Sequence, residues 1–149
     1  MQQENSSQAP CMFCTMPETM QRPLSPEERM QKARDLLSQG VQEFEAAESA
    51  DAELQVRRRG ALACETTFHS LIELVDALIV LARRPLPQSH DDRVEALRVM
   101  GRPDLATLYT EAFQALHISG YYGQRVGQMQ RDAMTSVKRT IERELAKLA

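Results

Sequence analysis

Residues 61–81, ALACETTFHSLIELVDALIVL, decide the fold. Their apolar side chains fall on most faces of a helix, which is typical of the central helix of a bundle. Pro85 and Pro87 follow this run and cannot continue a helix. The pattern therefore predicts a long helix that starts near Ser49 or Asp51 and ends before Pro85.

A strong start signal precedes the first predicted helix. In Ser25-Pro26-Glu27-Glu28, Ser25 can cap the helix, Pro26 suits the first helical position and Glu28 completes a capping box. An apolar stripe then continues to about residue 48, although Gly40 interrupts it.

Further start and stop signals divide the second half of the chain. Ser89 is a cap for a short helix closed by Gly101, and Pro103 starts the next helix. The motif Gly120-Tyr121-Tyr122-Gly123 predicts a break. A last helix is expected from Gln124 or Gln128 to Leu148, with Met129 and Leu148 among its inward residues.

These elements define the fold class: all-α, an up-down antiparallel bundle of four to five helices with a disordered N-terminal tail. Residues 1–24 hold three prolines and no apolar period, so we expect disorder there, and a helical bundle over 25–149. Aromatic residues are only 5% of the chain and Trp is absent. The core must therefore consist of aliphatic side chains, which suits packed helices better than a β-sandwich.

Charge and composition limit the partners. The net charge of −3 argues against a general polyanion binder. The last stretch is nevertheless mildly basic, with Arg125, Arg131, Lys138, Arg139, Arg143 and Lys147 against Asp132, Glu142 and Glu144. No apolar run reaches membrane-spanning length, and no signal peptide is recognisable. With three cysteines, we expect a reduced, cytoplasmic protein and no membrane partner.

Cys11 and Cys14 have the spacing of half a zinc site. A structural zinc site needs four ligands, and no second cysteine pair follows. We therefore expect no cofactor, and zinc is the one cofactor kept as an alternative. Pairing of the motif across a dimer would complete a four-cysteine site. Cys64, in the apolar run, is expected to be a buried core residue.

A polar stripe crosses the central helix at Glu65, His69, Glu73 and Asp76, within a quarter of its circumference. One interpretation is an internal acid–imidazole or metal site completed by His117. The spacing differs from the Glu-x-x-His of bundle di-metal sites. The other interpretation, which we favour, is a solvent edge or a set of carboxylates satisfied by Arg from a neighbouring helix.

All three tyrosines, Tyr109, Tyr121 and Tyr122, lie with His117 in the stretch around the predicted break. Tyrosine is favoured where the ring of its side chain meets an apolar surface and its hydroxyl meets water. The stretch predicts a pocket or a dimer interface, with packing of the bundle end as the alternative.

The run Arg57-Arg58-Arg59 points in three directions on a helix, so we expect a solvated face there.

The layout resembles a HEPN domain in three stretches. These are Thr67-Phe68-His69-Ser70-Leu71 in the long helix, Pro85-Leu86-Pro87-Gln88-Ser89-His90 opening a short helix, and Gly120-Tyr121-Tyr122-Gly123 before the basic last helix. The resemblance implies a bundle that often dimerises and acts in toxin–antitoxin, defence or RNA-processing systems. Ribonuclease members of that family carry Arg, four to six residues, then His in a late helix, and this chain lacks that motif there. Arg83 and Arg84 have the spacing to His90, but in a Pro-rich loop.

Together these features predict a non-catalytic, HEPN-like binding or interaction module, in a stress or toxin–antitoxin-type system. We expect a homodimer that binds nucleic acid, nucleotide or a partner protein. Enzyme activity is left open, with a HEPN-type ribonuclease or a metal-binding bundle as alternatives. The candidate ligand-binding residues are His69, Glu73, His117, Tyr121, Tyr122, Arg125 and Arg131, and the candidate metal ligands are Cys11 and Cys14.

Overall fold

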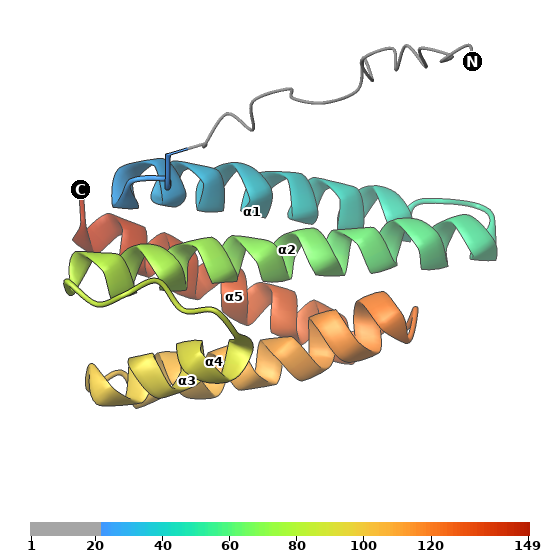
Figure 1. Ribbon diagram of the computed structural model, residues 1–149. Helices are drawn as coiled ribbons and strands as arrows, with labels where there is room; N and C mark the ends of the chain where they lie inside the picture. The colour runs from blue at the N-terminus through green and yellow to red at the C-terminus, as the bar shows by residue number, and fades with distance from the viewer. Residues whose placement is uncertain (1–21) are drawn as a thin grey trace, which may run out of the picture.

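The computed structural model describes residues 22–149, and within them the all-α prediction is confirmed (Figure 1). The elements are α1 (Pro26–Glu48), α2 (Glu53–Leu81), α3 (His90–Val99), α4 (Pro103–Ala112), the π-helix η1 (Phe113–Tyr122) and α5 (Gln128–Lys147). Most of the predicted tail, with Cys11 and Cys14, lies outside the described residues. Each helix within residues 22–149 is too short or too polar to span a lipid bilayer.

The helices form two layers (Figure 1). The antiparallel pair α1 and α2 is the upper layer, and α4 continues directly into η1 as one long rod in the lower layer. Helix α5 runs behind α2, while the short α3 lies in front of α4. The C-terminus returns to the end of the bundle where α1 begins.

Helix α1 starts as the sequence predicts. Ser25 Oγ accepts a hydrogen bond from the Glu28 backbone amide at 3.2 Å, and Glu28 accepts from the Ser25 amide at 2.8 Å. Such a cap contributes about 1 kcal/mol. At Gly40, α1 and α2 approach so closely that a Cβ would collide with Thr67 of α2. The glycine therefore permits close packing of the two helices.

Helix α2 supplies the centre of the core. Phe68, Leu71, Leu74, Val75 and Ile79 are fully buried, and burying one such side chain contributes about 1.5–3 kcal/mol. The helix ends at Leu81, earlier than predicted, and the chain turns at Arg83, whose φ is 57°.

The last third follows the sequence prediction at its break and differs from it at the ends of the last helix. The π-helix ends at Tyr122, with Gly123 as its cap, so the break predicted at residues 120–123 is present. Met129 and Leu148 were expected inside but are 61% and 44% exposed. The buried stripe of α5 runs through Met134, Val137, Ile141 and Leu145.

Candidate functional site

Helices α2, α3 and η1 bring all three histidines together at one place. The His90 and His117 ring centroids are 5.7 Å apart, and His117 and His69 share the carboxylate of Glu65. The rings of Tyr121 and Tyr122 also contact His117. We call His69, His90, His117, Tyr121 and Tyr122 the histidine–tyrosine site.

Glu65 connects two of the imidazoles. Its Oε2 lies 2.6 Å from His117 Nδ1, across 52 residues of sequence, and its Oε1 lies 3.0 Å from His69 Nε2, one turn along α2. The carboxylate is 19% exposed and the His117 side chain 16%, so this contact is largely shielded from water. Because an ionised carboxylate only accepts hydrogen bonds, His117 Nδ1 carries the proton and its Nε2 is the free nitrogen.

Tyr109 orients the third imidazole. His90 Nδ1 lies 2.6 Å from the hydroxyl of Tyr109, which is fully buried in α4. Burial raises the pKa of Tyr109 well above its usual range, against the lowering effect of Arg93, so the phenol keeps its proton. The phenol therefore donates to His90 Nδ1, and the free Nε2 of neutral His90 carries a hydrogen.

The pKa of His90 is lowered from its ordinary value of 6.5. Burial is the first cause, followed by the positive charges of Arg93 and His117, while Asp91 and Glu65 oppose the shift. When both rings are neutral, the free Nε2 of His90 is a donor and the free Nε2 of His117 is an acceptor.

The rings form a continuous series from the core to the surface. Phe68 and Phe113 lie 5.4 Å and 5.3 Å from the His117 ring, and Tyr122 meets it edge-on at 5.0 Å. Tyr121 is stacked with His117 at 6.3 Å and contacts Tyr122 at 5.0 Å. Tyr122 is 69% exposed and the His69 side chain 54%, so this series ends in an open aromatic surface.

The π-helix fixes these rings in place. Gly120 approaches α2 so closely that a Cβ would lie 2.8 Å from Cys64 Sγ. On the other side, the buried amide of Gln130 donates to the Ala115 carbonyl at 3.1 Å and to Ser119 Oγ at 3.2 Å. Helix η1 is thus held by both α2 and α5, and π-helical segments are frequent at functional sites.

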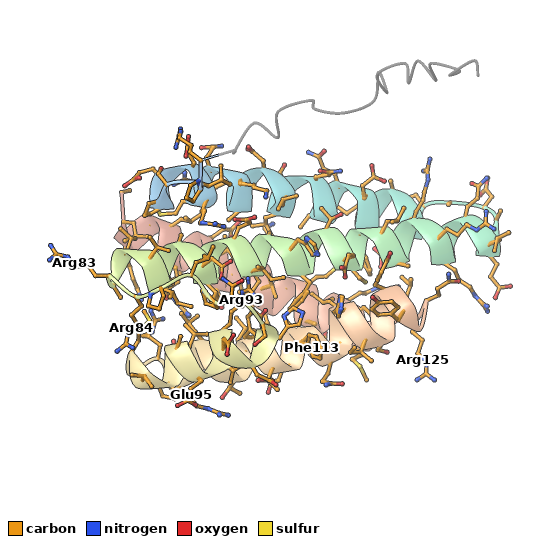
Figure 2. All side chains as sticks on the ribbon, viewed as in Figure 1. Arg83, Arg84, Arg93, Glu95, Phe113 and Arg125 are labelled. Atoms are coloured by element: carbon orange, nitrogen blue, oxygen red, sulfur yellow. The ribbon has the colours of Figure 1, made fainter. Side chains whose placement is uncertain are left out.

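Glu73, predicted as a ligand-binding residue, belongs to a separate network. It accepts from Arg29 at 2.8 Å and from Lys32 at 2.6 Å, both in α1. One turn further, Asp76 holds Arg93 of α3 through two hydrogen bonds of 2.8 and 2.9 Å. In Figure 2, Arg93 lies between α3 and α2. Both carboxylates are therefore paired with basic side chains of the neighbouring helices α1 and α3.

The two predicted arginines are in different places. Arg125 follows the tyrosines and projects from the end of the bundle (Figure 2). With Arg57 of α2 it lines a groove of about 690 Å³ that also contains Gly123 and the first residues of α5. Arg131 instead pairs with Glu48 of α1, so it does not join the histidine–tyrosine site.

Metal ligation has limited support in the described residues. Within residues 22–149, no three His, Cys, Asp or Glu side chains are arranged to hold a metal ion. Glu65 uses separate oxygens for His69 and His117, and Glu73 faces Arg29 and Lys32, so the predicted stripe is divided. Cys64 is buried, and burial raises the pKa of its thiol to about 12, which suits the expected core role.

Arg83 and Arg84 have the sequence spacing of the ribonuclease motif to His90, but they do not form a site with it. Figure 2 shows both arginines at one end of the bundle, away from Phe113. His90 packs against Phe113, with ring centroids 4.7 Å apart. The sequence singles out His90 only through this spacing and the loop before α3, neither of which predicts its contact with His117.

No family model matches this chain, and no curated protein or solved structure matches it either. The HEPN resemblance therefore stays a prediction from the sequence.

Proposed function

We propose that the protein is a non-catalytic, HEPN-like binding module that binds single-stranded nucleic acid at the histidine–tyrosine site. The observation that carries this proposal is the exposed Tyr122 beside a groove with two arginines. Gly123 follows Tyr122 directly and lines the groove with Arg57 and Arg125. A cytoplasmic homodimer in a stress or toxin–antitoxin-type system is the setting that the sequence suggests.

The aromatic surface suits unpaired bases. Tyr122 is 69% exposed, while its contacts with His117 and Tyr121 hold the ring at a fixed angle. Stacking of one base on such a ring is worth about 1–3 kcal/mol and is tolerant of sequence. Bases within a duplex would not be available to this surface.

The groove suits the backbone of the same strand. Arg57 comes from α2 and Arg125 from the loop before α5, so two elements supply positive charge. The amides of the first turn of α5 also face anions favourably. Arg57 forms an ion pair with the exposed Glu53 at 2.5 Å. Because an exposed ion pair contributes little free energy, a phosphate can displace Glu53 from Arg57.

Fluorescence anisotropy with a labelled single-stranded oligonucleotide tests this function. Two phosphate contacts predict a slope of about −1.4 for log affinity against log salt. Arg125→Ala should weaken binding and flatten the slope, whereas Arg139→Ala, an exposed position on α5, should do neither. Equal effects of both variants, or no binding at low salt, would reject the proposal.

A second candidate is a ribonuclease, favoured by the Glu65–His117 pair. His117 Nε2 could take the proton of a ribose 2′-hydroxyl, and the His90 Nε2 hydrogen could bind a phosphoryl oxygen. Incubation with RNA and with DNA of the same sequence separates the two functions. Cleavage of RNA only, lost in His117→Gln and Glu65→Gln, would establish the enzyme, while unchanged RNA would leave binding alone.

Exposed apolar side chains support the homodimer that the HEPN resemblance implies. Leu62 of α2 and Ile118 of η1 are 59% and 41% exposed, on two of the three helices that carry the site. Exposed apolar and aromatic side chains of this kind favour protein contacts. Native mass spectrometry of the purified protein would detect a dimer, and a strictly monomeric protein would reject it.

A further inference from the structure

We propose that His90 is an acid-sensitive latch, whose protonation releases the N-terminal end of α3 from η1 and opens the histidine–tyrosine site. As regulation of a nucleic-acid site this rests on the function proposed above, whereas the movement of α3 does not depend on it.

The N-terminal end of α3 is attached to the bundle by few side chains. It is a helix of ten residues, and Leu97 is its one fully buried side chain. Its first residue, His90, packs against Phe113 at 4.7 Å and Phe68 at 5.6 Å, and accepts the Tyr109 hydrogen bond. One turn further, Arg93 is held by Asp76. Val94 and Ala96 also pack, partly buried, against the core. The N-terminal end of the helix is therefore held by the His90 imidazole, the Arg93–Asp76 ion pair and the partly buried Val94.

Protonation of His90 would disturb the first of these contacts. Nδ1 accepts a hydrogen bond from Tyr109, and a protonated imidazole has no acceptor nitrogen. The buried phenol would then lose the acceptor for its hydrogen, and leaving such a group unsatisfied is unfavourable. The charged groups around His90 come from every helix packed against it: Asp91 and Arg93 of α3, Glu65 and Asp76 of α2, Tyr109 of α4 and His117 of η1.

The balance of these charges opposes a positive His90. Asp76 is occupied by Arg93, and Glu65 is shared by His117 and His69. Asp91 is exposed at the start of α3, so water screens it. Arg93 lies one turn away along α3, and the His117 ring lies 5.7 Å from the His90 ring. The direction of the His90 pKa, lowered by burial and by these neighbours, agrees with the geometry.

The sign of the pH dependence follows from linkage. Because the closed state lowers the pKa of His90 below 6.5, the closed state binds protons less readily than the open one. Closure is therefore complete above pH 6.5 and weakens as pH falls below it. At pH 5.5 a single histidine can favour opening by at most about tenfold.

Hydrogen exchange of the full chain without nucleic acid tests the latch. After correction for intrinsic rates, protection of α3 should fall up to about tenfold from pH 7.5 to 5.5, while α1 and α2 keep theirs. His90→Gln should remove this response, because the glutamine carbonyl can accept from Tyr109 without titrating. His69→Gln, which removes an exposed histidine of the same site, should keep it.

Several results would overturn the proposal. These are unchanged protection of α3, an equal loss in all helices, or an unaltered response in His90→Gln. If His90→Gln does not fold, NMR of the wild-type chain decides: the His90 ring and the α3 amides should titrate with one midpoint, and separate midpoints would reject the latch.

The link to binding needs one more comparison. A single-stranded oligonucleotide should bind more tightly at pH 5.5 than at pH 7.5, because the open site exposes a second face of His117. This gain should be several-fold smaller in His90→Gln, and an equal gain would reject regulation by His90. Absence of binding at both pH values would instead reject the proposed function while the exchange result stands.

Discussion

Gly120 of η1 lies directly against Cys64 of α2, and a Cβ on the glycine would come within 2.8 Å of the cysteine sulfur and 2.9 Å of its Cβ. Both groups are buried, so neither can move into solvent. The distance between the π-helix and the central helix is therefore set by the absence of one side chain.

We expect Gly120→Ala to destabilise the fold by about 1–3 kcal/mol, because overpacking at such a contact forces the helices apart. Urea unfolding followed by circular dichroism measures this loss. Gly127→Ser is the control, since a Cβ there would make only an ordinary contact with Gln130 Oε1, at 3.7 Å, and serine caps the α5 N-terminus at least as well as glycine. Equal stability of Gly120→Ala and wild type would contradict the close contact.

The same contact predicts a protected thiol. Burial raises the pKa of Cys64 to about 12, with Glu65 adding to the shift. In a Cys11→Ser/Cys14→Ser variant, the remaining thiol should react with a maleimide on the order of a thousandfold more slowly than in urea, because the thiolate is the reactive form. Similar rates in the two conditions would show that Cys64 is accessible.

The fold was readable from the sequence where the signals are local. The Ser25–Glu28 capping box and Ser89 before α3 each act within a few residues, and each marks a helix start in the structure. Pro85 only bounds α2, which already ends at Leu81. The expected inward positions of Met129 and Leu148 failed because helix ends are only partly covered by neighbours.

The site was readable only in part, because its contacts are not local. The polar stripe of the central helix predicts His69, and the stretch around the break predicts His117, Tyr121 and Tyr122. These four side chains do lie together. His90 was missed as a neighbour of His117, since nothing in a short window reports packing between α3 and η1. The π-helical register of η1 has no simple apolar period that would predict it.

Arg93 is expected to be the most sensitive charged residue of α3. Its side chain is 13% exposed and that of Asp76 4%, and the next cation near Asp76, Arg29, lies 3.8 Å away. Arg93→Ala should cost about 3 kcal/mol, since removing one partner leaves a buried charge poorly compensated. Arg98→Ala, which breaks an exposed pair with Glu95 on the same helix, should change stability by less than about 0.5 kcal/mol.

Unfolding curves of both variants at neutral pH measure this difference. High salt should leave the Arg93→Ala loss almost unchanged, because buried pairs are screened little. A loss that disappears in salt would place the Asp76–Arg93 pair at the surface.

The acid limb of stability should depend on Glu144. Burial alone would raise its pKa, but hydrogen bonds from Arg102 and Lys147 outweigh burial and lower it. A lowered pKa stabilises the fold above the unfolded value near 4.5, and this contribution is lost as pH falls through the folded pKa. Between pH 5 and 3, Glu144→Gln should therefore lose less stability than wild type.

Urea midpoints at several pH values check this prediction, with Glu142→Gln, an exposed position on the same helix, as the control. The slope of urea midpoint against pH should be reduced but not abolished in Glu144→Gln, because the pKa of Asp104 is also lowered by its hydrogen bond with Arg102. Identical slopes in wild type and Glu144→Gln would mean that the Arg102–Glu144 contact does not persist in solution.

Tyr122 separates stacking from simple apolar contact in the proposed nucleic-acid site. Its ring is 69% exposed, so Tyr122→Phe and Tyr122→Leu should each change stability by less than about 0.5 kcal/mol. Phenylalanine keeps the ring, whereas leucine keeps only apolar surface. If bases stack on this position, Tyr122→Phe should bind a single-stranded oligonucleotide as wild type does, while Tyr122→Leu should lose about 1–3 kcal/mol, or roughly fivefold to 150-fold in affinity. Equal affinities of the phenylalanine and leucine variants would mean that Tyr122 contributes apolar contact alone, as in a protein interface, and would move the site from nucleic acid to a protein partner.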